Sequence, residues 1–176
     1  MFVTIASAGL GLLVTKARQA QQQREGVEAI LKFGGVVRYD YQFNSRGIYH
    51  DDASMPKPAW LRELVGVDFF AYVTYVGLHN RSFTDGDLVH LRGMTKLNRL
   101  DLESTGVSDA GLIHLKGFRQ LKILRLYDTD VTDAGLVHLL QLDGLEFLNL
   151  QLTKTTSKGR ETLKKALPKL DISPSL

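Results

Sequence analysis

The sequence lacks cysteine altogether, and its charge is nearly balanced. Without cysteine the chain has no disulfide, no thiolate nucleophile and no cysteine-ligated zinc site. With 22 basic and 19 acidic side chains, the net charge of +3 is too small to indicate a nucleic-acid partner. The sequence also has no glycine-rich phosphate loop, no serine nucleophile elbow and no HExxH metal sequence. These absences exclude the enzyme classes that depend on such motifs.

What the sequence does have is the composition of a globular protein. Its 176 residues suit one domain with enough chain to bury a sizeable core. Hydrophobic residues make up 44% of the chain and charged residues 23%, which argues against wholesale disorder.

Residues 1–16 form an apolar segment in which the first charged side chain is Lys16. A helix that spans a membrane needs about 20 apolar residues, so the segment is short. A secretory signal would place a basic region before its apolar core, and none precedes this one. We expect the segment to anchor the protein to a membrane; the alternative is an apolar tail on a cytoplasmic protein. The orientation stays open, because basic residues after the segment favour a cytoplasmic body, whereas a missing basic region before it would reverse that.

A unit of 24 residues recurs through the second half of the chain. The stretch "SDAGLIHL" at 108–115 returns as "TDAGLVHL" at 132–139. A fixed period of this kind is typical of a solenoid, in which each unit buries its apolar side against the next. Columns in register include Leu100, Leu124 and Leu148, then Thr105, Thr129 and Thr153, then Asp85, Asp109 and Asp133.

Each unit predicts a short strand followed by a short helix. The segments "LNRLDL", "LKILRL" and "LEFLNL" alternate at their last three positions, as in a strand with one face inward. Ser or Thr before Asp-Ala-Gly predicts a helix start. There the hydroxyl accepts an early backbone N–H, and the carboxylate lies at the positive end of the helix dipole.

The pattern LxxLxLxxTxxTDxGLxxL resembles leucine-rich repeats of the cysteine-containing type, with Thr in place of Cys or Asn. The resemblance covers about residues 70–172. The chain looks most like short bacterial leucine-rich-repeat proteins with an N-terminal apolar segment. It implies an α/β solenoid with parallel strands on the concave face and short helices on the convex face. It also implies that Thr105, Thr129 and Thr153 bond backbone groups between coils. The same repeat type occurs in F-box substrate receptors, but this sequence shows no F-box.

The ends depart from the repeat pattern, as a solenoid requires. We expect residues 71–176 to hold about four leucine-rich repeats and a degenerate C-terminal capping repeat. Residues 17–70 are expected to be an α+β cap of helix, strand, loop and helix on the first coil. In this cap "GVVRYDYQF" predicts a half-buried strand, and "PAWLRELVG" predicts a helix that begins near Pro58 and stops at Gly66.

The outward positions of the predicted strands are the candidate binding site. Neighbouring strands lie about 4.8 Å apart, so these positions form a compact grid on the concave face. Arg, Tyr and Phe are enriched in interface hot spots. The alternative is a solvated face whose charges pair with one another, such as Arg125 across from Asp101. The predicted partner-binding residues are Tyr75, His79, Arg99, Asp101, Glu103, Arg125, Tyr127, Phe147, Asn149 and Gln151.

The sequence leaves three functions open, of which we favour the first. It is a non-catalytic protein-protein interaction module, a monomer without cofactor or metal, which binds an unidentified protein through the concave face. The second is an enzyme or metal-dependent activity centred on the cap loop "YHDD" around His50, and the third is a structural part of a larger assembly. The column His90, His114 and His138 is not expected to bind metal. Helices packed about 8–10 Å apart hold imidazoles too far apart for ligands at about 2 Å.

Overall fold

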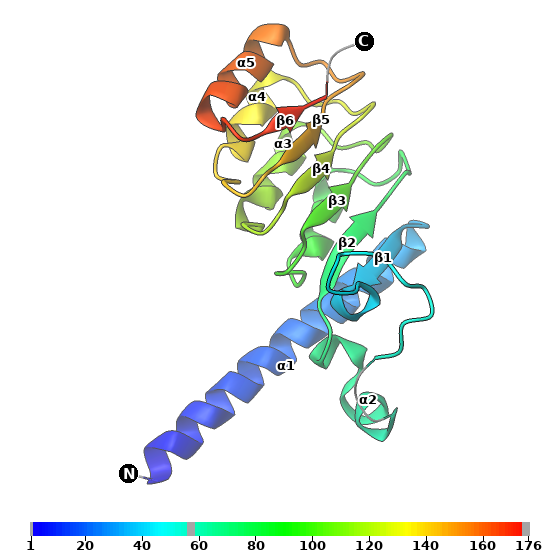
Figure 1. Ribbon diagram of the computed structural model, residues 1–176, viewed down its shortest axis with the longest axis vertical. Helices are drawn as coiled ribbons and strands as arrows, with labels where there is room; N and C mark the ends of the chain where they lie inside the picture. The colour runs from blue at the N-terminus through cyan, green and yellow to red at the C-terminus, as the bar shows by residue number, and fades with distance from the viewer. Residues whose placement is uncertain (1, 56–58, 174–176) are drawn as a thin grey trace.

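One six-stranded sheet runs through the repeat region (Figure 1). The computed structural model describes residues 2–55 and 59–173. The strands follow one another in chain order across the sheet, and every neighbouring pair is parallel except the first. They are β1 (Val36–Tyr39), β2 (Val73–Gly77), β3 (Arg99–Asp101), β4 (Ile123–Arg125), β5 (Phe147–Asn149) and β6 (Asp171–Ile172).

Short helices carry the chain from one parallel strand to the next, and they lie on one side of the sheet (Figure 1). The fold is therefore α/β and solenoid-like, with a mostly parallel sheet, as the repeat predicts. The helices are the 3₁₀ helix η3 (Asp85–Leu91), α3 (Asp109–Leu112) with η4 (Ile113–Gly117), α4 (Asp133–Leu136) with η5 (Val137–Leu139), and α5 (Ser157–Ala166).

The strands pair in the register that the 24-residue period predicts. Leu124 pairs with Leu100 on one side and with Leu148 on the other. All three side chains have 0% exposure and belong to one hydrophobic core that extends through the repeats. Burial of this apolar column removes it from water and supplies the main free energy that holds the coils together.

The threonine column closes each coil on itself. The hydroxyls of Thr105, Thr129 and Thr153 each donate to the carbonyl oxygen of the leucine three residues earlier, at 2.7 Å. The expectation that these hydroxyls join neighbouring coils is therefore wrong, because the nearest acceptor is a carbonyl of their own coil. They satisfy a backbone acceptor beside the core, which would be costly to leave unpaired.

Adjacent coils are joined instead by the aspartate column. The Asp109 carboxylate accepts two hydrogen bonds from Thr132 of the next coil, from its backbone N–H at 2.8 Å and from its hydroxyl at 2.6 Å. The equivalent bonds from Thr156 hold the pKa of Asp133 below its ordinary value. We call this series the aspartate ladder; its steps are Asp85 to Ser108, Asp109 to Thr132 and Asp133 to Thr156.

A glycine three residues after each ladder hydroxyl makes room for the carboxylate of the preceding coil. A Cβ atom at Gly135 would lie 2.3 Å from Oδ1 of Asp109, too close for any side chain. Gly111 and Gly159 face the preceding aspartate in the same way. Asp-Ala-Gly thus encodes more than the predicted helix start, because it also contains the space that the neighbouring coil's carboxylate occupies.

A single helix, α1 (Phe2–Lys32), contains both the predicted membrane segment and the start of the cap. It continues without a break across the boundary predicted between residues 16 and 17, and its first half projects away from the sheet (Figure 1). Within the described ranges, no helix has the length and apolarity needed to cross a membrane.

The second half of α1 packs against the first coil. Gln23 is only 1% exposed there, and its amide group donates to the Asp68 carboxylate and to the Ala71 carbonyl, each at 2.9 Å. Its side-chain oxygen accepts the backbone N–H of Val73 at 3.0 Å. One buried side chain therefore ties α1 to the segment that enters β2.

The rest of the cap departs from the predicted lengths. The strand predicted in "GVVRYDYQF" ends at Tyr39, because its register with β2 shifts after Arg38 and the chain turns into the 3₁₀ helix η1 (Asp40–Gln42). The predicted second helix is α2 (Ala59–Val65), which Gly66 ends with a φ of +82°, and η2 (Val67–Phe69) follows it. Pro58, where this helix was expected to begin, lies outside the described residues.

The last coil carries polar side chains that form hydrogen bonds within the coil. Arg160 donates its Nε–H to the Thr155 hydroxyl at 2.9 Å and a terminal N–H to the Leu150 carbonyl at 3.1 Å. Ser157 stands where the period would place another aspartate. The aspartate ladder therefore stops at this end of the array.

Candidate functional site

The predicted binding residues lie on and just beyond the outward side of the strands. Two rows cross the sheet in the expected register. The third row, made of His79, Glu103, Tyr127 and Gln151, follows the strand ends and lies in the loops. The first row is Tyr75, Arg99, Ile123 and Phe147, and the second is Gly77, Asp101, Arg125 and Asn149.

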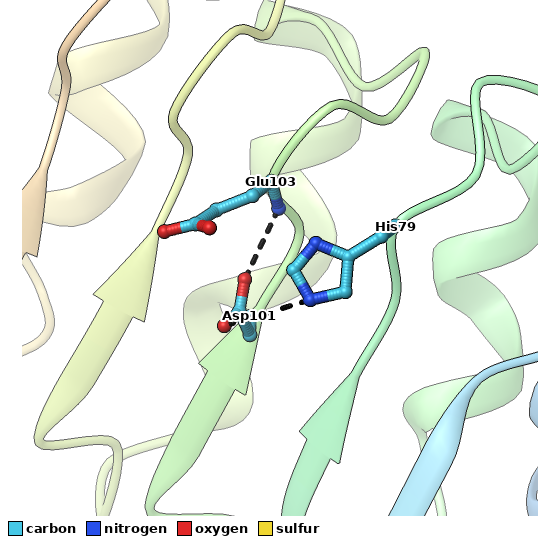
Figure 2. Close-up of side chains that lie close together, drawn as sticks. All are labelled: His79, Asp101 and Glu103. Atoms are coloured by element: carbon cyan, nitrogen blue, oxygen red, sulfur yellow. Dashed lines mark hydrogen bonds and ion pairs between the residues drawn. The ribbon is translucent and has the colours of Figure 1, made fainter.

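Three predicted residues come together where β2 and β3 end. Figure 2 shows His79, Asp101 and Glu103, with the His79 ring turned toward the Asp101 carboxylate. Nε2 of His79 lies 4.0 Å from Oδ2 of Asp101, and the backbone N–H of Glu103 donates to Oδ1 at 3.2 Å. One ligand-type atom from each residue lies within 4.8 Å of the others, a spacing that could hold a metal ion. Asp101 is only 2% exposed, so its charge requires partners.

Arg125 supplies the principal partner of this cluster. Its Nη1 atom lies 3.3 Å from Oδ2 of Asp101 and 3.9 Å from Oε1 of Glu103. The pairing of Arg125 with Asp101 considered in the sequence analysis does form. A divalent ion would have to compete with this fixed guanidinium for the same carboxylate oxygens. The geometry therefore favours a charge-balanced polar surface over a metal centre.

A second group of side chains crosses the first row, and half of it lies outside the predicted set. The guanidinium carbon of Arg38 lies 4.1 Å from the ring centroid of Tyr49 and 4.9 Å from that of Tyr75. Arg99 reaches the Tyr75 ring from β3, at 5.4 Å. These distances are those of cation–π contacts. We call Tyr49, Arg38, Tyr75 and Arg99 the Tyr–Arg ladder.

Strand pairing and one glycine set the position of this ladder. Tyr75 pairs with Arg38 of β1 and with Arg99 of β3, so the three side chains lie in line across the sheet. A Cβ atom at Gly77 would lie 2.4 Å from the Tyr75 hydroxyl, which shows that the ring lies across this glycine. Alternation in β1 does place Arg38 opposite Val37, but nothing in the sequence indicates that β1 pairs with β2. Sequence reasoning therefore missed Arg38.

The side chains of the cap loop pair with one another rather than gathering around His50. His50 pairs with the side-chain amide of Asn44 at 3.0 Å, while the Tyr49 hydroxyl donates to Asp51 at 2.7 Å, which raises the pKa of Tyr49. Over residues 2–55 and 59–173, His50, Asp51 and Asp52 do not form a group with metal-ligand spacing. Through Tyr49, which contacts Arg38, the loop reaches the outward side of the sheet.

Comparison with known proteins gives little beyond the chain's own geometry. No protein-family model matches the chain, and no curated protein sequence matches it either. Among solved structures, the chain is similar to a leucine-rich-repeat protein of Leptospira interrogans, with 18% identity and a TM-score of 0.37. The similarity covers 48% of this chain and 27% of that chain, so this chain spans about a quarter of its neighbour's length.

Proposed function

We propose that this chain is a leucine-rich-repeat module that binds a protein partner through its concave face and catalyses no reaction. The repeat pattern, the parallel register and the short helices on the other side of the sheet support the repeat type. The observation that carries the proposal is the first row of the sheet. Its residues Tyr75, Arg99 and Phe147 are half-buried, in line and not used by the core.

The contrast between the two sides of the strands supports a binding role. Inward side chains such as Leu124 are committed to the core, and the aspartate ladder fixes the helix starts. Aromatic and guanidinium groups on the outward side are the types that contribute most to protein interfaces, where truncation of a central contact typically costs about 2 kcal/mol or more. The short array favours a small partner. We expect the chain to bind it as a monomer.

The test is affinity capture from the native cell with a concave double variant, Tyr127→Ala with Phe147→Ala. This pair leaves Arg125 in place, so Asp101 keeps its charge partner. We expect the folded variant, checked by circular dichroism, to lose the protein that the wild type captures.

A matched control removes apolar area from the other side of the molecule. Ile113 and Val137 are 47% and 55% exposed, and Ile113→Ala with Val137→Ala should capture as the wild type does. Capture that survives the concave change but fails when His50, Asp51 and Asp52 are replaced would assign the function to the cap loop.

A further inference from the structure

The Tyr–Arg ladder is the part of the concave face whose charge is not balanced. Arg125 pairs with Asp101, and Arg81 pairs with Asp128 at 2.7 Å. Within the described part of the chain, Arg38 and Arg99 have no carboxylate within 4.0 Å. Two half-buried guanidinium groups therefore stand in one row with aromatic rings as their neighbours.

The rings hold these guanidinium groups in place before any partner binds. Nε of Arg38 and Nε of Arg99 are both buried and have no hydrogen-bond partner in the described structure. A guanidinium that stacks on a ring keeps its N–H donors in its own plane, so it can bind a carboxylate without leaving the ring. An arginine held in this way loses less side-chain entropy on binding than one that is free in solvent.

The same row continues into apolar side chains. Arg99 pairs with Ile123, and Ile123 with Phe147, so two apolar positions follow Arg99 across the strands. Arg38 and Arg99 lie on β1 and β3, two strand spacings of about 4.8 Å apart. An extended chain rises about 3.3 Å per residue, so the two arginines match carboxylates about three residues apart in an extended segment.

We infer that the Tyr–Arg ladder binds an extended acidic segment of the protein partner, with carboxylates on Arg38 and Arg99 and an apolar side chain beside Ile123 and Phe147. This inference rests on the proposed function and adds the chemistry of the partner. Charge complementarity carries it, because the two unpaired cations are fixed in the row that the proposed function uses.

The probe is a fluorescein-labelled oligoglutamate peptide, with binding measured by fluorescence anisotropy on the full chain at about 50 mM salt to limit screening. We expect Arg38→Gln with Arg99→Gln to weaken binding roughly tenfold or more, because both bidentate donors are lost. The matched control is Arg92→Gln with Arg119→Gln, which removes the same charge from two exposed arginines and should bind as the wild type does. Equal losses in the two variants would mean diffuse attraction and would overturn the inference.

A second variant keeps the test decisive if the glutamine pair does not fold. Arg38→Lys with Arg99→Lys keeps both charges, but an ammonium group cannot bind a carboxylate bidentately, so we expect an intermediate loss. Full binding by the lysine pair, or no binding by the wild type, overturns the inference. So does displacement of the peptide by inorganic phosphate at matched ionic strength, which would make the ladder a phosphate site.

The two proposals fail in different ways. If the wild type does not bind oligoglutamate while capture of the partner protein still depends on Tyr127 and Phe147, only the acidic-segment inference is wrong. If capture does not depend on the concave face at all, both proposals are wrong.

Discussion

Among single residues, the glycine of each Asp-Ala-Gly sequence is closely constrained by its surroundings. An alanine at position 135 would be the better helix former by up to about 1 kcal/mol. Its Cβ atom would nevertheless lie 2.3 Å from Oδ1 of Asp109, so either the carboxylate leaves Thr132 or the coils move apart. Steric fit decides against intrinsic propensity at this position.

We therefore predict that Gly135→Ala lowers the free energy of unfolding by about 1–3 kcal/mol, as overpacking does elsewhere. The measurement is urea unfolding followed by circular dichroism. Gly86→Ala is the matched control, because a Cβ there meets nothing within 4 Å. Equal stability of the two variants would show that the aspartate ladder does not require this space.

At the scale of elements, the attachment of α1 depends on buried polar contacts as well as on apolar packing. Gln23→Leu would leave the Ala71 carbonyl and the Val73 N–H without their partner and remove one hydrogen bond from Asp68. We expect a loss of about 2–4 kcal/mol, because each buried unpaired group costs about 1–3 kcal/mol.

The control for this prediction is Gln22→Leu, one residue earlier on the exposed side of the same helix. Hydrogen exchange of the Val73 amide measures the local effect, and urea unfolding measures the global one. If both glutamine variants were as stable as the wild type, α1 would not be held by Gln23.

The elements also show what the sequence could and could not predict. The strands β3 to β5 and the burial of Leu124 were predictable because the same strand pattern, with its inward leucine, recurs in three successive units. The pair Arg125 and Asp101 followed from that register. The antiparallel pairing of β1 and the contact between Arg38 and Tyr75 could not be predicted. Each occurs once and depends on how the cap folds back onto the first coil. The bonding of Thr105 within its own coil depends on backbone geometry that residue types do not reveal.

For the whole molecule, one core shared by all coils predicts cooperative unfolding. Leu124→Ala removes buried apolar volume at its centre and should cost about 2–5 kcal/mol. Because each coil is stabilised by its neighbours, we expect the slowest amides of β2 and β5 to lose protection together.

Native-state hydrogen exchange checks this prediction. Loss of protection in β5 alone would show that parts of the array unfold independently. A cost below about half a kcal/mol would contradict the register of the core.

The aspartate ladder has a direction. The hydroxyl and backbone N–H of one coil donate to the carboxylate of the preceding coil, and the carboxylate of that coil accepts from the next. A tandem duplication of 24 residues that includes Asp109 and Thr132 would therefore produce a coil whose partners already exist on both sides. Gene duplication can lengthen the middle of this array, whereas Ser157 ends the series at the C-terminal side. The Tyr–Arg ladder is built on β1, which occurs once, so it would stay a single site however long the array became.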